Sequence, residues 1–86
     1  MTKPQEPPRL SNQERFIFIY LTGSLGIDIP IDELWRWVYG EKSKLPVKRL
    51  RQQRIGRLIS RLRVKRPKYV WEPGALKGTY RARRRR

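Results

Sequence analysis

The chain has 86 residues, a formal net charge of +15, and neither cysteine nor histidine. This length fits one small domain, and the missing residue types exclude disulfides, thiolate or imidazole metal sites, and nucleophile pairs that use histidine. The seven carboxylates are scattered and form no evident acid–base pair. We therefore expect a protein that is not an enzyme and that holds no cofactor.

The N-terminal stretch MTKPQEPPRL lacks the apolar segment of a signal peptide. No run in the chain approaches the roughly 18 apolar residues of a membrane span. These features predict a cytoplasmic protein. Residues 1–9 hold three prolines and no periodic pattern, which indicates a flexible arm.

Next along the chain, the sequence predicts a helix over residues 11–22. Ser11 and Glu14 have the spacing of a capping box, in which each side chain satisfies a free backbone N–H group of the other. The run FIFIYL that follows is apolar on every side, so period alone does not separate strand from helix. The cap favours a buried helix that ends near Gly23 and Gly26.

An extended segment and a second helix are expected next. The β-branched segment IDIPI, residues 27–31, is interrupted by Pro30 and suits a short strand at a sheet edge. Asp32 is then expected to cap a helix that Gly40 ends. The side chains expected in the core are Leu34, Trp35, Trp37 and Val38.

The second half predicts a linker, a long helix that Pro67 stops, and a hairpin around a Pro-Gly turn. The expected ranges are 41–46 for the linker, 47–65 for the helix, 68–71 and 78–83 for the strands, and 84–86 for a disordered basic tail. The fold class is therefore mainly α with a small β-hairpin.

Charge is divided unevenly between the two halves. Residues 1–40 hold four basic and five acidic side chains, a net charge of −1, whereas residues 41–86 hold eighteen basic and two acidic ones, a net charge of +16. This asymmetry indicates a polyanionic partner, with nucleic acid ahead of an anionic membrane surface. The plainer interpretation is a solvated basic face.

The stretch RQQRIGRLISRLR, residues 51–63, combines both properties on the long helix. On a helical wheel an aliphatic stripe gathers within about 60° of Ile55, and a cationic stripe gathers on another side. The aliphatic stripe is Ile55, Leu58, Ile59 and Leu62, and the cationic stripe is Arg54, Arg57, Arg61 and Lys65. Like charges at this spacing repel one another, and nearby phosphates would relieve the repulsion. Gly56 costs about 1 kcal/mol relative to alanine in a helix. Two interpretations stay open: it allows close approach of a neighbouring helix or DNA backbone, or it has no functional role.

Four segments in order, LSNQE, DELWRWVYG, RIGRLISRLR and GTYRAR, resemble the C-terminal winged-helix DNA-binding domain of OmpR/PhoB-type response regulators. The matching positions are Glu33, Leu34, Val38, Tyr39 and Gly40 in the second helix, Ile59, Arg61, Leu62 and Arg63 in the recognition helix, and Tyr80 and Arg81 in the wing. Thr79 stands where that family usually has glycine. The similarity covers about residues 10–83, without the family's N-terminal sheet or receiver domain and with a longer connection after Gly40.

The resemblance implies a winged helix-turn-helix of three helices plus a C-terminal wing, bound to double-stranded DNA. Arginine recognises guanine and glutamine recognises adenine, each with paired hydrogen bonds. The recognition-helix candidates for DNA contact are Gln53, Arg54, Arg57, Arg61 and Lys65, the first four for base edges and Lys65 for phosphate. The candidates for wing and backbone contact are Arg49, Lys68, Lys77, Thr79, Arg81 and Arg83.

The function expected from these features is that of a transcription regulator on the nucleoid, of a size that suits a phage or plasmid protein. Three alternatives stay open. They are a non-specific architectural DNA-binding protein, a small module that docks on RNA polymerase or another acidic protein surface, and a binder of structured RNA.

Overall fold

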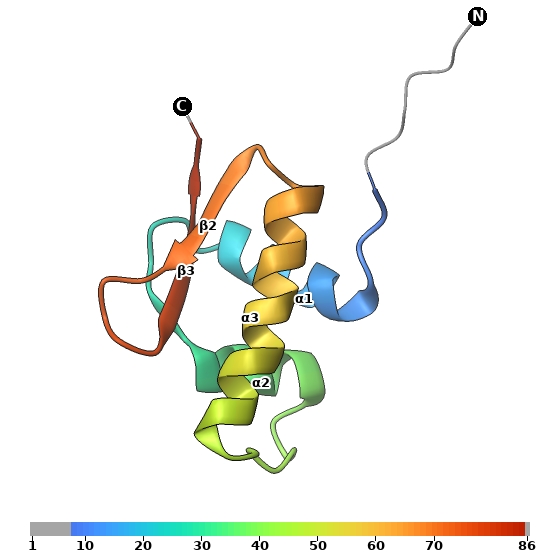
Figure 1. Cartoon of the computed structure of the whole chain (residues 1–86), viewed down its shortest axis with the longest axis vertical. Helices are drawn as coiled ribbons and strands as arrows, with labels where there is room; N and C mark the ends of the chain where they lie inside the picture. Colours follow the sequence, from blue (N-terminus) through green and yellow to red (C-terminus); the bar gives the residue numbers. More distant parts are fainter. Residues whose placement is uncertain (1–7, 86) are drawn as a thin grey trace, which may run out of the picture.

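The computed structural model describes residues 8–85. Most of the expected arm, residues 1–7, and Arg86 of the expected tail lie outside the described residues. In chain order the elements are α1 (Asn12–Thr22), β1 (Ile29–Pro30), α2 (Ile31–Tyr39), α3 (Lys48–Lys65), β2 (Tyr69–Pro73) and β3 (Thr79–Arg84). The fold is a small α+β arrangement in which the hairpin of β2 and β3 lies beside α3 (Figure 1).

The expected capping box opens α1. The Ser11 N–H donates to Oε1 of Glu14 at 2.8 Å, and the Glu14 N–H donates to Oγ of Ser11 at 3.2 Å. Gly23 ends the helix, and Gly26 follows with a φ of 77°, a backbone conformation that favours glycine. The predicted helix is thus confirmed to within one residue.

The short strand β1 adds a third strand to the expected hairpin. The sheet is antiparallel with the order β1-β3-β2, so Pro30 lies on an edge strand as its missing N–H requires. The expected cap of α2 is wrong, because the helix begins at Ile31 directly after Pro30 and has no side-chain cap. The Ile31 N–H instead donates to the Gly78 carbonyl at 3.0 Å. Asp32 pairs with Arg51 at 3.2 Å.

The core lies between the three helices and one face of the sheet. Its buried apolar side chains are Ile17, Leu21, Ile29, Ile31, Leu34, Trp35, Ile55, Leu58, Ile59, Leu62, Trp71 and Ala82. Trp37 was expected there but is 48% exposed, and its indole N–H donates to the Phe16 carbonyl at 2.8 Å. Within residues 8–85, no helix has both the length and the apolar character that crossing a membrane requires.

The hairpin is longer than the sequence predicts. Trp71 faces Ala82 in the register, and the ladder continues until Tyr69 faces Arg84. The Arg85 N–H then donates to the Lys68 carbonyl at 3.2 Å. Arg84 and Arg85 are therefore held against β2, and assigning them to a disordered tail is wrong.

Candidate nucleic-acid interface

The aliphatic stripe predicted for α3 is present in the fold, and three of the four members of the predicted cationic stripe are exposed on the solvent side. Ile55, Leu58, Ile59 and Leu62 are the buried residues of the helix. On its solvent side Arg54, Arg57 and Arg61 are exposed, and none of the three forms an ion pair with another described residue. We call these three side chains the arginine ridge. The helix therefore packs through its aliphatic stripe while it presents uncompensated charge to solvent.

Open grooves flank the arginine ridge on both sides. One runs between α3 and β3 and is lined by Gln52, Gln53, Gly56, Ser60 and Tyr80 together with Arg57 and Arg61. The other runs between α3 and the first two helices, where Gln13 and Tyr39 face all three ridge arginines. The Arg54 guanidinium also lies 5.9 Å from the centre of the Trp35 ring, which orients it by a cation–π contact. Arg57 and Arg61 border both grooves and so form the most prominent part of this surface.

The loop of residues 74–78, between β2 and β3, is fixed beside the N-terminal end of α3. The Leu76 N–H donates to Oδ2 of Asp28 at 3.1 Å. A Cβ atom at Gly74 would lie 2.5 Å from the Asp28 carboxylate, so only glycine fits there without a shift. A further groove is lined by Lys77 and Gly78 of this loop and by Lys48 and Gln52 of α3, so the loop and the helix share one surface.

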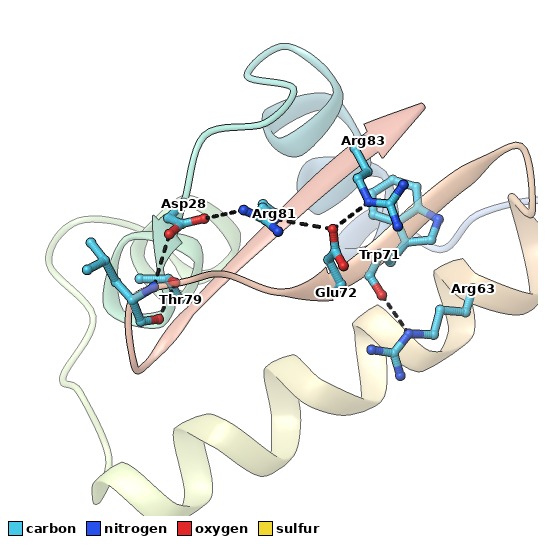
Figure 2. A network of polar contacts seen from close by, with 8 residues as sticks. Asp28, Arg63, Trp71, Glu72, Thr79, Arg81 and Arg83 are labelled. Atoms are coloured by element: carbon cyan, nitrogen blue, oxygen red, sulfur yellow. Dashed lines mark hydrogen bonds and ion pairs between the residues drawn. The ribbon is translucent and has the colours of Figure 1, made fainter. Parts of the chain in front are cut away.

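Two of the predicted contact residues, Arg81 and Arg83, form ion pairs with acids of the same fold, although the Arg83 side chain is 53% exposed (Figure 2). Oε1 of Glu72 accepts from Nε of Arg81 at 3.2 Å and from Nε of Arg83 at 2.7 Å. The hydrogen bond from Arg83 is the largest effect and lowers the pKa of Glu72, burial opposes it, and the hydrogen bond from Arg81 lowers the pKa further. Arg81 also lies 3.8 Å from Asp28. These guanidiniums stabilise the sheet and are already neutralised.

Thr79, another predicted contact, is buried. Its hydroxyl donates to the Leu76 carbonyl and closes the 74–78 loop. The side chain therefore cannot reach a partner at the surface.

Lys65, the last member of the predicted cationic stripe, turns toward α1. Its ammonium lies 2.8 Å from Oε1 of Glu14, whose side chain is 1% exposed, and it also donates to the Arg9 carbonyl at 3.2 Å. Burial alone would raise the pKa of Glu14. The hydrogen bonds from Lys65 and from Ser11 outweigh burial and hold that pKa below its usual value. Lys65 is thus a structural ion-pair partner.

The structure consequently divides the predicted DNA-contact residues into those that are exposed and those that are engaged within the fold. Together on one surface are Gln53, Arg54, Arg57 and Arg61 of α3 and Lys77 of the neighbouring loop. Arg49 is exposed near the start of α3. Lys68 is exposed in the turn after α3, and Lys65, Thr79, Arg81 and Arg83 are engaged within the fold. Sequence reasoning missed Gln52, Ser60 and Tyr80, although the helical period already placed Gln52 and Ser60 on the flank of α3 next to Gly56.

No family model matches the chain, and neither a curated protein nor a solved structure matches it. The resemblance to the OmpR/PhoB-type domain therefore depends on the quoted motifs alone. Among residues 8–85, no three carboxylates gather closely enough to hold a metal ion. What the surface offers is a row of guanidinium donors flanked by amide and hydroxyl groups, a chemistry suited to phosphates and base edges.

Proposed function

We propose that the chain is a winged-helix DNA-binding protein that regulates transcription. In this proposal the arginine ridge of α3 enters the major groove, and the 74–78 loop contacts the adjacent minor groove or its phosphates. The observation that carries the proposal is the ridge itself, three neighbouring guanidiniums without an acidic partner on the described chain.

The acids of the described chain that form ion pairs do so with cations outside the ridge. Glu14, Asp28, Asp32 and Glu72 each contact a basic side chain where two elements meet. Their partners are Lys65, Arg81, Arg51 and Arg83. These four cations are therefore compensated by acids, and the arginine ridge is not. Repulsion between like charges three and four residues apart costs a few tenths of a kcal/mol for each pair, and a phosphate-lined groove would remove that cost.

The ridge and its surroundings support two separate contributions to binding. Displacement of condensed counterions by Arg49, Lys68 and the ridge is independent of base sequence and weakens as salt rises. Paired hydrogen bonds from Arg57 or Arg61 to guanine, and from Gln53 to adenine, discriminate between bases by about 1–3 kcal/mol each. In this proposal Lys77 enters a narrow minor groove.

The experiment that tests the proposal is selection of bound duplexes from a random pool at two salt concentrations. We expect one sequence to be enriched at both. Arg57→Ala is expected to relax the preference at one or two base positions, whereas the matched control Arg49→Ala weakens binding to all duplexes alike. If the two variants act identically, the division between base and phosphate contacts is wrong.

The same experiment separates the remaining classes of function. Binding to every duplex without enrichment would replace regulation by an architectural role. A lack of any stable complex at about 0.15 M salt would overturn DNA binding, and it would favour docking of the basic surface on an acidic protein such as RNA polymerase.

A further inference from the structure

A cluster of exposed aromatic and aliphatic side chains lies on α1 and α2. Phe16 is 42% exposed, Ile19 53% and Trp37 48%. The Trp37 ring forms T-shaped contacts with Phe16 and Tyr20, with ring centres 6.5 and 5.2 Å apart and interplanar angles of 84° and 85°. These four residues form what we call the aromatic patch. Contiguous exposed apolar surface of this kind marks an interaction site more often than single exposed side chains do.

Within the aromatic patch, Ile19 lies on the side of α1 away from α3. Glu14, Ile17 and Leu21 are the buried residues of α1, which packs on α3. At 100° per residue Ile19 points about 160–170° away from the centre of that buried face. A molecule bound on the arginine ridge therefore leaves the aromatic patch accessible.

The acids beside the aromatic patch differ from the other acids of the described chain, which form ion pairs. Glu33 and Glu41 are the acids within residues 8–85 that form no ion pair with a basic side chain. Both line one hollow with Tyr20, Trp37 and Arg36. Glu33 accepts a hydrogen bond from the Tyr20 hydroxyl at 2.8 Å, which raises the pKa of Tyr20. Arg36 contributes one positive charge to the hollow, so its acids are only partly offset.

The combination of π faces and uncompensated carboxylates fits guanidinium groups. Arginine stacks on tryptophan and tyrosine faces while its N–H groups bond carboxylate oxygens. The chain itself carries such groups at the end of β3, where Arg84 and Arg85 are exposed and form no ion pair with another described residue. We propose that the aromatic patch binds the C-terminal arginine segment of a second copy of this chain.

A contact between two different surfaces of the same chain is heterologous. Such contacts build rows of molecules when the rotation between copies does not close a ring. Two copies of net charge +15 repel one another in dilute salt, so the contact strengthens where the charge is screened or neutralised. A polyanion along the arginine ridges provides that neutralisation, but the contact itself does not require DNA. A test of this contact is therefore independent of a test of the proposed function.

The test uses a synthetic peptide of residues 80–86 titrated into the full chain at about 0.15 M salt and followed by NMR. We expect shifts concentrated at the Trp37 indole N–H and at Phe16 and Ile19. Trp37→Ala should lower the peptide affinity about tenfold or more, since buried aromatic contacts dominate interfaces. Glu41→Gln should lower it about threefold, as for an exposed ion pair.

Ile19→Lys provides a second variant that keeps Trp37 and adds a repulsive charge to the aromatic patch. It is expected to reduce binding as strongly as Trp37→Ala while leaving the folded spectrum intact. Absence of shifts in the aromatic patch at millimolar peptide, or unchanged affinity in both variants, would overturn the proposal.

Sedimentation of the full chain tests whether the molecule bound at the aromatic patch is a second copy of this chain. At about 0.5 M salt, where the Debye length is about 4 Å, we expect the wild type to associate as its concentration rises. The double variant Arg84→Ala/Arg85→Ala should stay monomeric. If the peptide binds but the wild type is monomeric under all conditions, a second copy is not the occupant, and the site would take a basic segment of another protein.

Discussion

Lys65 and Arg61 stand about one turn apart on α3, yet their surroundings differ in kind. The Lys65 ammonium lies 2.8 Å from a carboxylate that is almost wholly buried, whereas Arg61 borders two open grooves and forms no ion pair with another described residue. Both belong to one cationic stripe in the sequence. The difference shows that the position of the acids, contributed by other elements, decides which basic residues hold the fold together and which stay free for a partner.

The largest effect expected from this comparison is on stability. Lys65→Met removes the cation from Glu14 and leaves a buried carboxylate unpaired, so we expect a loss of about 3 kcal/mol in the free energy of unfolding. The matched change Arg61→Met should alter it by less than about 0.5 kcal/mol. Urea denaturation followed by tryptophan fluorescence measures both. Equal losses in the two variants would remove the distinction between structural and free cations.

The loop that shares a surface with the ridge should be nearly as sensitive. In Gly74→Ala the new Cβ would lie 2.2 Å from the Thr79 hydroxyl oxygen and 2.5 Å from Asp28, so the loop must shift. We expect a destabilisation of about 2 kcal/mol, typical of overpacking. The measurement is the urea midpoint with an unchanged slope. If stability is unaffected, Asp28 does not hold the loop as described.

The Glu14–Lys65 pair also predicts a dependence of stability on pH. The pKa of Glu14 is lower in the folded protein than in the unfolded chain, so the pair stabilises the fold near neutral pH, and this stabilisation is lost as the pH falls and Glu14 becomes protonated. The wild type and Lys65→Met should therefore converge in stability as the pH falls below about 4.3, the ordinary pKa of Glu, and then through the lower pKa of Glu14 in the folded protein. Denaturation curves at several pH values test this, and a constant difference between the two proteins down to pH 2 would contradict the role given to Glu14.

The smallest expected effect concerns Gly56, which lines the groove between α3 and β3 beside the arginine ridge. A Cβ at Gly56 would meet the Tyr80 hydroxyl at 3.5 Å, an ordinary contact, so packing does not require glycine there. Gly56→Ala should stabilise the protein by about 1 kcal/mol. The same variant is also tested for DNA binding, beside Arg49→Ala as the control. If Gly56→Ala weakens DNA binding and Arg49→Ala leaves base preference unchanged, Gly56 serves close approach of the DNA. A loss of stability would instead show that Tyr80 packs more tightly than the structure indicates.

Local features of the fold could be predicted from the sequence because they depend on neighbouring residues. The capping box of Ser11 and Glu14, the edge position of Pro30 and the aliphatic stripe of α3 all follow from spacing or residue type. The short strand was expected as an extended edge segment, but its pairing with β3 depends on residues about 50 positions away. Trp37 was misplaced because an alternating apolar run does not reveal which side meets α1.

The candidate site was only partly predictable for the same reason. The helical wheel identified Arg54, Arg57 and Arg61, since their common side follows from the helical period. Nothing local indicates that Glu14 reaches Lys65, which lies 51 positions further along the chain. In the same way, Glu72 neutralises Arg81 and Arg83 only once the hairpin register sets them beside each other. The sequence therefore could not predict which acidic and basic side chains pair with each other across the fold.

The most direct measurement of the central claim is the slope of log affinity for a duplex against log salt concentration. It compares the wild type, the triple variant Arg54→Met/Arg57→Met/Arg61→Met, and Lys65→Met under conditions where all are folded. Each phosphate contact contributes about 0.9 to the slope. We predict that the triple variant is shallower by about 2–3 and that Lys65→Met matches the wild type. Equal slopes for the wild type and the triple variant would contradict the claim that the arginine ridge contacts the phosphate-lined groove.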